Sequence, residues 1–313
     1  MKVPILVIAY NRGDNLRDLL LDLESLPARA IHISVDGSRD GEVLDNPVYK
    51  VAQEFQFSSH HSVTTQIMPE NLGLLQHFKV ALSSFFNQNE FGIILEDDME
   101  FSPSFIEYVD LFGEKLLSQN VWSICGHNPI DVSVDNNGES KESVSFFYTH
   151  THTIWGWATS ARVIGQFLEF LASSQLRRLA LEAIRTQAPL MAINPFLKKS
   201  FARTWNFKLS RNLSSLSPNW DNLWVIAAWH FKKPSIMSTR CLVVEGRNQN
   251  IGQTHIHTKK MVSLARFKVE EKHGQPDPIK IFREQKMIEV WGIKSSNHLR
   301  LIAIKWKSFF NEF

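Results

Sequence analysis

Two different spacings of hydrophobic residues alternate along the first hundred positions of the chain. Short runs rich in apolar and β-branched residues predict strands at residues 5–9, 30–35, 63–68 and 93–95, and the last of these, the uninterrupted run Ile93–Leu95, is typical of a strand buried on both faces. Between them, apolar residues recur at helical spacing, at Leu16, Leu19, Leu20 and Leu23, within Val48–Phe55, and at Leu74, Phe78, Ala81, Leu82 and Phe85. This order predicts an α/β fold with a doubly wound, mostly parallel sheet.

The second half of the chain is less regular. We expect a strand and loop at residues 122–128, an exposed polar excursion at 131–143, a basic helical insertion at 165–218, a helix from Asn219 to Trp229 and a strand at Cys241–Glu245. The basic residues of the insertion are typical of a solvated helix face, and they would also suit an anionic acceptor or a membrane surface.

The last fifteen residues also have helical spacing. Their apolar positions are Leu299, Ile302, Trp306, Phe309, Phe310 and Phe313, with Arg300, Lys305 and Lys307 between them. A basic amphipathic helix of this kind can lie on an anionic membrane, and it can equally dock on its own domain.

Composition narrows the class of protein. With 313 residues, 43% of them hydrophobic, the chain can bury a large core, and a formal net charge of +2 argues against nucleic acid as a partner. No run approaches the ~18 apolar residues of a membrane span. The two cysteines, Cys125 and Cys241, give no disulfide framework and favour a reducing compartment, so we expect a cytoplasmic protein, at most peripheral at the inner face of the membrane.

Three consecutive carboxylates, Glu96, Asp97 and Asp98, end the fourth predicted strand. Open α/β sheets bind ligands at the carboxyl ends of their strands, and clustered carboxylates repel one another unless a cation offsets their charge. Ser102-Pro103 then has the residue types that begin a helix. The simple interpretation is a solvated acidic turn. The alternative that this framework favours is a seat for Mn²⁺ or Mg²⁺ holding a nucleotide diphosphate.

These motifs occur in one order that resembles the GT-A glycosyltransferases related to N-acetylglucosaminyltransferase I, especially bacterial nucleotide-diphospho-sugar transferases. The resemblance spans roughly residues 3–258 and rests on Arg12, Asp36, Asn71-Leu72-Gly73 with His77, Glu96-Asp97-Asp98 with the following helix, Trp155-Gly156-Trp157 and Trp220-Asp221. It implies a GT-A fold with a nucleotide-sugar-binding half at 1–128, an acceptor-binding half at 129–258 that includes the insertion, and a C-terminal helical tail at 259–313.

The resemblance also implies roles for individual residues. Asp98 resembles the direct metal ligand, and Asp221 is similar to the aspartate that deprotonates the acceptor hydroxyl. The other residues resemble groups that bind the donor. Asp36 would contact the uracil, and Arg12 and His77 would lie near the base and phosphates. Glu96 and Asp97 would contact the ribose and sugar, and Trp155, Gly156 and Trp157 would line the site. The segment between Trp157 and Trp220 is longer than in the eukaryotic enzyme, so the resemblance does not imply which acceptor this chain uses.

Each of these assignments has a structural alternative. Asp221 could instead cap a helix, Arg12 could be an ordinary surface arginine, and any of nine tryptophans could lie in the core. Two His-x-His pairs, His150 with His152 and His255 with His257, could supply zinc ligands, but exposed strand positions explain them more simply, with one late histidine near the diphosphate.

The sequence therefore predicts a metal-dependent, inverting glycosyltransferase that moves a sugar from a UDP-sugar donor to a hydroxyl of a glycan or glycoconjugate, with a bacterial cell-surface glycan as the expected acceptor. One rival is a nucleotidyltransferase acting on sugar phosphates, although Asn11–Asn15 is a poor match for the Gly-rich basic loop that it would need. A silent sugar- or nucleotide-binding module is the rival from another class, and it would be expected to lack the metal carboxylate or the base.

Overall fold

The computed structural model describes residues 2–39, 46–58, 60–128, 143–191, 206, 208–210, 213, 220–238, 240–245 and 268–273. Within these residues a nine-stranded sheet has the order β11-β7-β9-β6-β8-β4-β1-β2-β3, and β10 pairs with β5 in a separate ribbon. Five of the strand pairs in the large sheet are parallel and three are antiparallel. The predicted α/β class with a mostly parallel sheet is confirmed.

The elements alternate in the first half of the chain and become irregular in the second. The strands are β1 (Ile5–Ala9), β2 (Ala30–Val35), β3 (Ser62–Ile67), β4 (Phe91–Glu96), β5 (Met99–Phe101), β6 (Ile124–Cys125), β7 (Ser143–Thr149), β8 (Trp157–Ser160), β9 (Ser235–Ser238), β10 (Val243–Glu245) and β11 (Lys268–His273). The helices are α1 (Gly13–Glu24), α2 (Pro47–Glu54), α3 (Leu74–Phe86), α4 (Pro103–Leu117), α5 (Ala161–Ala172), α6 (Leu176–Met191) and α8 (Trp220–His230).

The direction of the strand order reverses at β1. The chain runs from β1 outward through β2 to β3, then returns to place β4 on the other side of β1, parallel to it. The loops that leave β1 and β4 therefore diverge from adjacent strand ends, which is where doubly wound sheets bind their ligands. Beyond β4 the antiparallel strand β8 begins the mixed part of the sheet.

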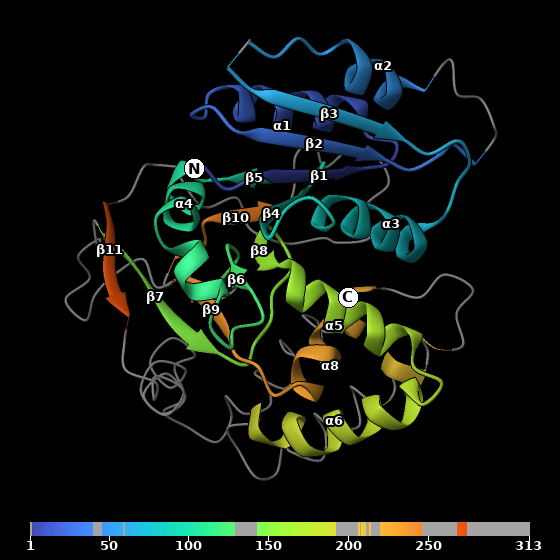
Figure 1. Ribbon diagram of the computed structural model, residues 1–313, viewed down its shortest axis with the longest axis vertical. Coiled ribbons are helices and arrows are strands. Elements are labelled where there is room, and N and C mark those ends of the chain that lie inside the picture. The colour runs from blue at the N-terminus through green and yellow to red at the C-terminus, as the bar shows by residue number, and fades with distance from the viewer. Residues whose placement is uncertain are drawn as a thin grey trace, which may run out of the picture.

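Helices cover both faces of the sheet, as Figure 1 shows. Side chains of β1 alternate between two apolar clusters, because successive residues of a strand point to opposite faces. Ile5 and Val7 pack in the cluster that contains residues of α1, α2 and α4, whereas Leu6 and Ile8 join residues of α3, α5, α6 and α8. The continuous apolar run of β1 is thus explained by burial on both sides.

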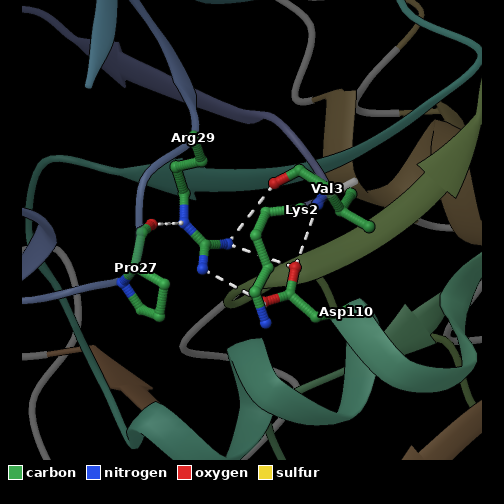
Figure 2. Close-up of polar contacts among 5 residues, drawn as sticks. All are labelled: Lys2, Val3, Pro27, Arg29 and Asp110. Atoms are coloured by element: carbon green, nitrogen blue, oxygen red, sulfur yellow. Dashed lines mark hydrogen bonds and ion pairs between the residues drawn. The ribbon is translucent and has the colours of Figure 1, made fainter. Parts of the chain in front are cut away.

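A buried ion pair connects the starts of β1 and β2 to α4, at the edge of the sheet opposite the carboxyl ends of these strands (Figure 2). Arg29, just before β2, contacts Asp110 of α4 through Nη2 and Oδ2 at 3.0 Å, and both side chains are at most 4% exposed. Arg29 Nε also donates to the carbonyl of Pro27, and the backbone N–H of Val3 donates to Asp110. The pair joins the start of β1, the start of β2 and α4 in one network.

Most predicted elements of the first half agree with the structure. β1 and β2 have the predicted bounds, and α2, β3 and α3 differ from them by about one residue. One side chain was misplaced, because Leu74 lies in the first turn of α3 and is 47% exposed, outside the apolar face. Residues 131–142 of the expected excursion, most of 192–219 and the amphipathic tail lie outside the described residues, and the domain boundaries stay predictions.

Two further observations concern the surface. Arg177, Arg178 and Arg185 of the basic insertion are exposed on α6, which packs against α8 through Ala180 and Ile184. No helix in the described part of the chain has both the length and the apolar character needed to cross a bilayer.

Candidate active site

The acidic loop leaves the sheet beside the point where the strand order reverses. β4 ends at Glu96, residues 97 and 98 form a tight turn, and the chain continues into β5. The backbone N–H of Asp97 donates to the carbonyl of Ile8 at 3.0 Å, which holds the loop against the end of β1. The two carboxylates of the turn are therefore fixed by the sheet itself.

Arg12, in the loop that leaves β1, binds both carboxylates of this turn. Its Nη2 lies 2.5 Å from Asp97 Oδ1, and its Nη1 donates to Asp98 Oδ2. The three side chains differ in burial, with Asp97 1% exposed, Asp98 10% and Arg12 39%. Arg12 thus lies over the acidic pair on its solvent side, which excludes the interpretation of an isolated surface arginine.

Burial and charge shift the protonation of this cluster. The pKa of Asp97 is raised to about 6, first because burial penalises its charged form and further because Asp98 is negative, while Arg12 and the N–H of Tyr10 oppose the shift. Burial acts to lower the pKa of Arg12, but the charges of Asp97, Asp98 and Glu96 more than offset it, so the pKa of Arg12 is raised. The guanidinium is charged at every relevant pH.

Asp36, predicted to accept from a nucleotide base, already accepts four hydrogen bonds within the protein. Oδ1 accepts from the backbone N–H groups of Gly37 and Leu72 at 2.9 Å each. Oδ2 accepts from the N–H of Gly73 at 3.1 Å and from Asn71 Nδ2 at 3.3 Å. Asp36 therefore holds the loop before α3 against the end of β2.

The same junction explains one of the glycines. A Cβ on Gly37 would lie 2.1 Å from the carbonyl carbon of Glu70, closer than real Cβ atoms approach, so the two loops can meet only at a glycine.

His77 is placed beside Asp36 by the first turn of α3. Its Nε2 lies 2.9 Å from Ser34 Oγ at the end of β2, and the residue is 4% exposed. Burial lowers the pKa of His77, against the opposing charge of Asp36, so the imidazole is neutral near pH 7. That His77 contacts the donor stays a prediction.

The Trp155-Gly156-Trp157 segment divides between the site edge and the core. Trp157 is 1% exposed and packs against Trp224 with ring centroids 4.4 Å apart. Trp155 is partly buried, and its ring meets that of His127 edge-on at 4.3 Å. The structure therefore places Trp157 in the core, and Trp155 is the one of the two that keeps an exposed surface.

Gly156 has the close backbone approach that was predicted for it. Its φ is +59°, and a Cβ would lie 2.6 Å from Val243. The N–H of Gly156 donates to the sulfur of Met99 at 3.0 Å, directly after the acidic turn. The segment is thereby attached to the acidic loop.

Asp221 lies in the first turn of α8, partly exposed, and its Oδ1 accepts from the N–H of Asn222 at 2.6 Å. The preceding Trp220 stacks on Phe78 of α3 with centroids 3.6 Å apart, next to His77 in the chain. Lys208 is 9% exposed, and burial lowers its pKa to about 8 against the opposing charge of Asp221. Asp221 is therefore connected to the site through α3.

The first His-x-His pair does not occupy the exposed positions expected of it. His152 is 5% exposed, with Nδ1 2.7 Å from Ser235 Oγ, and burial lowers its pKa well below the usual value. His255 and His257 lie outside the described residues. Cys125 and Cys241 are both buried, and burial raises the pKa of Cys125.

His127 is a site-edge residue that the sequence did not single out. Its Nδ1 lies 3.0 Å from the carbonyl of Val243, and its Nε2 is buried without a hydrogen-bond partner. Burial lowers the pKa of His127 to about 4.

The carboxylate pair has the chemistry of a divalent-metal site. Mg²⁺ and Mn²⁺ prefer oxygen ligands and use one or two protein carboxylates, with substrate phosphates completing the shell. A cationic group, the Arg12 guanidinium, already lies on oxygens of Asp97 and Asp98. Within the described residues no group of three His, Cys, Asp or Glu side chains comes together. Two adjacent carboxylates fit a metal whose remaining ligands come from substrate and water.

Comparison with known proteins shows that part of the chain matches a family model. The model of the GNT-I family, the N-acetylglucosaminyltransferase I family, matches residues 1–162. This span is just over half of the 313 residues, and it includes the acidic turn, Arg12, Asp36, His77 and the segment around Gly156. Asp221 lies beyond it.

Two other comparisons add little. No curated protein matches the chain. One solved structure, described as a glucose-1-phosphate thymidylyltransferase from Bacillus anthracis in complex with sucrose, is 14% identical, covers 56% of this chain and 78% of its own, and has a TM-score of 0.28.

Proposed function

This chain belongs to the GNT-I family of glycosyltransferases, and we propose that it moves a sugar from a UDP-sugar to a hydroxyl of a glycan or glycoconjugate with inversion, in a reaction that depends on Mn²⁺ or Mg²⁺. The family typically uses a divalent metal. The donor and the course of the reaction are our proposal.

The observation that carries this proposal is the acidic pair Asp97–Asp98 at the reversal of strand order, with Arg12 on top of it. Doubly wound sheets bind nucleotides at this position. Two carboxylates and one arginine supply both signs of charge that a metal-bridged diphosphate needs, the carboxylates for the cation and the guanidinium for the phosphates.

Asp98 is the carboxylate that we assign as metal ligand, because it is the more exposed of the pair and Asp97 is committed to the protein interior. Asp98 would hold the metal, and a metal held there would supply positive charge for the departing diphosphate. Glu96 would contact ribose and sugar, and Asp97, which is buried beneath Arg12, would reach them only after Arg12 has moved. His77, Trp155 and Gly156 would border the donor. Asp36 would contact the base only by sharing oxygens that now hold the loop at Leu72.

Asp221 is the proposed general base. Inversion by direct displacement needs a group that takes the proton of the acceptor hydroxyl as it attacks. The carboxylate is partly exposed in the first turn of α8, and the stack of Trp220 on Phe78 fixes that turn against α3. The buried Lys208 interacts electrostatically with Asp221.

The test is a screen of nucleotide sugars by thermal unfolding, with and without Mn²⁺. A ligand that binds only the folded state raises the apparent stability, so we expect UDP-sugars to raise the unfolding temperature when metal is present and GDP-sugars to have little effect. Asp98→Asn should remove the metal-dependent shift and turnover while leaving the ligand-free unfolding temperature nearly unchanged.

The matched control is Glu90→Gln, which neutralises an exposed carboxylate just before the other end of β4. It should keep the full shift. The proposal fails if no nucleotide sugar stabilises the wild type in a metal-dependent way. The assignment of Asp98 fails if its Asn variant keeps full metal-dependent donor binding.

A further inference from the structure

We propose that Arg12 is an internal counter-cation that competes with the metal for Asp98 and passes to the diphosphate when donor binds, so that metal binding is conditional on the nucleotide. This inference rests on the proposed function and adds the regulation of the same site.

The contacts of Arg12 define the competition. Its Nη1 donates to Asp98 Oδ2 and its Nη2 contacts Asp97 Oδ1. An oxygen that accepts from a guanidinium cannot at the same time coordinate a metal along the same direction, and two cations this close repel each other. Arg12 must therefore leave Asp98 before Oδ2 can serve as a ligand.

Loss of a proton from Arg12 cannot end this competition. A guanidinium does not lose its proton in proteins, and the surrounding carboxylates raise the pKa of Arg12 further. Oδ2 of Asp98 is therefore released only when the Arg12 side chain moves, and a metal on the other oxygen would still lie close to the guanidinium charge. Free Mn²⁺ thus has to displace an ion pair, and its binding alone should be weak.

The side chain has the freedom to move and the backbone does not. The carbonyl of Arg12 accepts from the N–H of Leu16 at 3.0 Å at the start of α1, so the main chain is anchored. The side chain is 39% exposed, whereas Asp97 and Asp98 beneath it are 1% and 10% exposed. Movement therefore takes the guanidinium toward solvent, on the side from which substrate arrives.

A diphosphate offers Arg12 an alternative partner. Phosphate oxygens match the planar fork of a guanidinium as well as a carboxylate does. When the phosphates bind Arg12 in place of Asp98, Oδ2 of Asp98 becomes available to a metal. The metal and the nucleotide then increase the affinity of the protein for each other by the same factor. Arg12 thereby offsets part of the negative charge of the acidic turn until a diphosphate is present.

The experiment measures binding of Mn²⁺ alone, by the loss of the free Mn²⁺ signal in electron paramagnetic resonance, for wild type and Arg12→Gln. All variants are measured in the same buffer at the same pH. We expect the variant to bind free Mn²⁺ about tenfold to a hundredfold more tightly, the change that corresponds to one charge-assisted hydrogen bond. At saturating Mn²⁺ it should bind UDP at least about tenfold more weakly.

Two variants complete the design. Arg17→Gln removes the same charge from an exposed position on α1 and should change neither affinity by more than about twofold. Arg12→Lys keeps the charge without the fork, should bind Mn²⁺ with an affinity between wild type and Arg12→Gln, and keeps the proposal testable if the Gln variant does not fold.

Unchanged or weaker Mn²⁺ binding by Arg12→Gln would overturn the inference, because Arg12 would then support the carboxylates without competing for them. That result leaves the proposed function intact if UDP still binds with metal. Failure of wild type to bind UDP at any Mn²⁺ concentration would instead reject the proposed function, and the comparison of free Mn²⁺ affinities would still decide the role of Arg12.

Discussion

Replacing Asp36 by Asn tests whether this carboxylate is a structural clamp. In the wild type its two oxygens accept from three backbone N–H groups, those of Gly37, Leu72 and Gly73, and from the side chain of Asn71. The residue is 3% exposed. The Asn side chain has the same shape but only one oxygen that can accept hydrogen bonds. Its NH₂ group is itself a donor and would face two of the N–H donors that the carboxylate now satisfies.

The expected cost follows from these contacts. Two of the four hydrogen bonds are lost, and each buried donor left without an acceptor costs about 1–3 kcal/mol. The two hydrogen bonds that remain also weaken, because a neutral acceptor replaces a charged one. Asp36→Asn should therefore lower the free energy of unfolding by about 2–6 kcal/mol, a large part of the stability of an ordinary domain.

Urea unfolding measures this loss, and hydrogen exchange locates it. The N–H groups of Leu72 and Gly73 should exchange slowly in the wild type and much faster in the variant, while amides of β1 stay protected until global unfolding. Glu70→Gln is the control, since it neutralises an exposed carboxylate of the same loop and should change stability by less than about 0.5 kcal/mol.

An Asp36→Asn protein as stable as the wild type to within about 0.5 kcal/mol, with unchanged exchange at Leu72, would refute the clamp. Asp36 would then be available to a nucleotide base without disturbing the loop. If the clamp is confirmed, weaker donor binding by the variant has to be compared with its loss of loop protection before a base contact is inferred.

Three further substitutions test the base, the buried ion pair and a buried imidazole. Asp221→Asn keeps the shape of the side chain and should slow transfer by roughly 10²–10⁴-fold with donor affinity unchanged; near-normal steady-state turnover would return Asp221 to a structural role. Arg29→Met leaves the carboxylate of Asp110 buried and should cost about 3–5 kcal/mol in urea unfolding without changing donor affinity, whereas a change below about 1 kcal/mol would contradict a tightly held network. Because the pKa of His127 falls from 6.5 to about 4 on folding, the unfolded chain binds more protons between these values, and stability should rise with pH across this window by about 3 kcal/mol from this group. His127→Asn, compared with wild type by unfolding from pH 4 to 7, should lose that contribution, and an identical pH dependence would show that His127 does not titrate in this way.

The elements that were predicted well are those whose signals are local. β1 and β2 are bounded as expected because each apolar run ends at turn-forming residues. The start of α4 was also predicted, and Ser102 Oγ indeed accepts from the N–H of Ser104 at 3.3 Å. Sequence spacing contains this information directly, since caps and periodicity involve neighbours in the chain.

The contacts that were missed join distant segments. Arg12 and Asp98 are 86 residues apart, and Asp36 and Leu72 are 36 apart. Because parallel strands end at the same edge of a sheet, the predicted fold brings Arg12, Asp36 and the acidic turn to one edge, but it does not specify which of them touch. That depends on β4 lying beside β1 with a fixed register, which hydrophobic spacing does not specify.

The tryptophan pair shows a different limit. Trp155 and Trp157 flank one glycine and have the same residue type, so the sequence gives no reason to separate them. Trp157 begins β8 and pairs with Ile94, which points its ring into the core beside Trp224. Trp155 precedes the strand and keeps an exposed surface. The antiparallel strand, which the predicted parallel sheet did not include at this position, decides between core and site.

The acidic triplet likewise separates into unequal residues once it is folded. Asp97 is 1% exposed, accepts from the N–H of Tyr10 and has a pKa raised to about 6, whereas Asp98 is 10% exposed and reaches toward the solvent side. Glu96 still belongs to β4, and its charge contributes to the environment of Arg12. Once Arg12 has left the turn, a cation arriving from solvent would therefore reach Asp98 before Asp97, which lies beneath it as a buried counter-charge. Adjacent carboxylates in a motif can have different roles because a tight turn gives each of them a different depth.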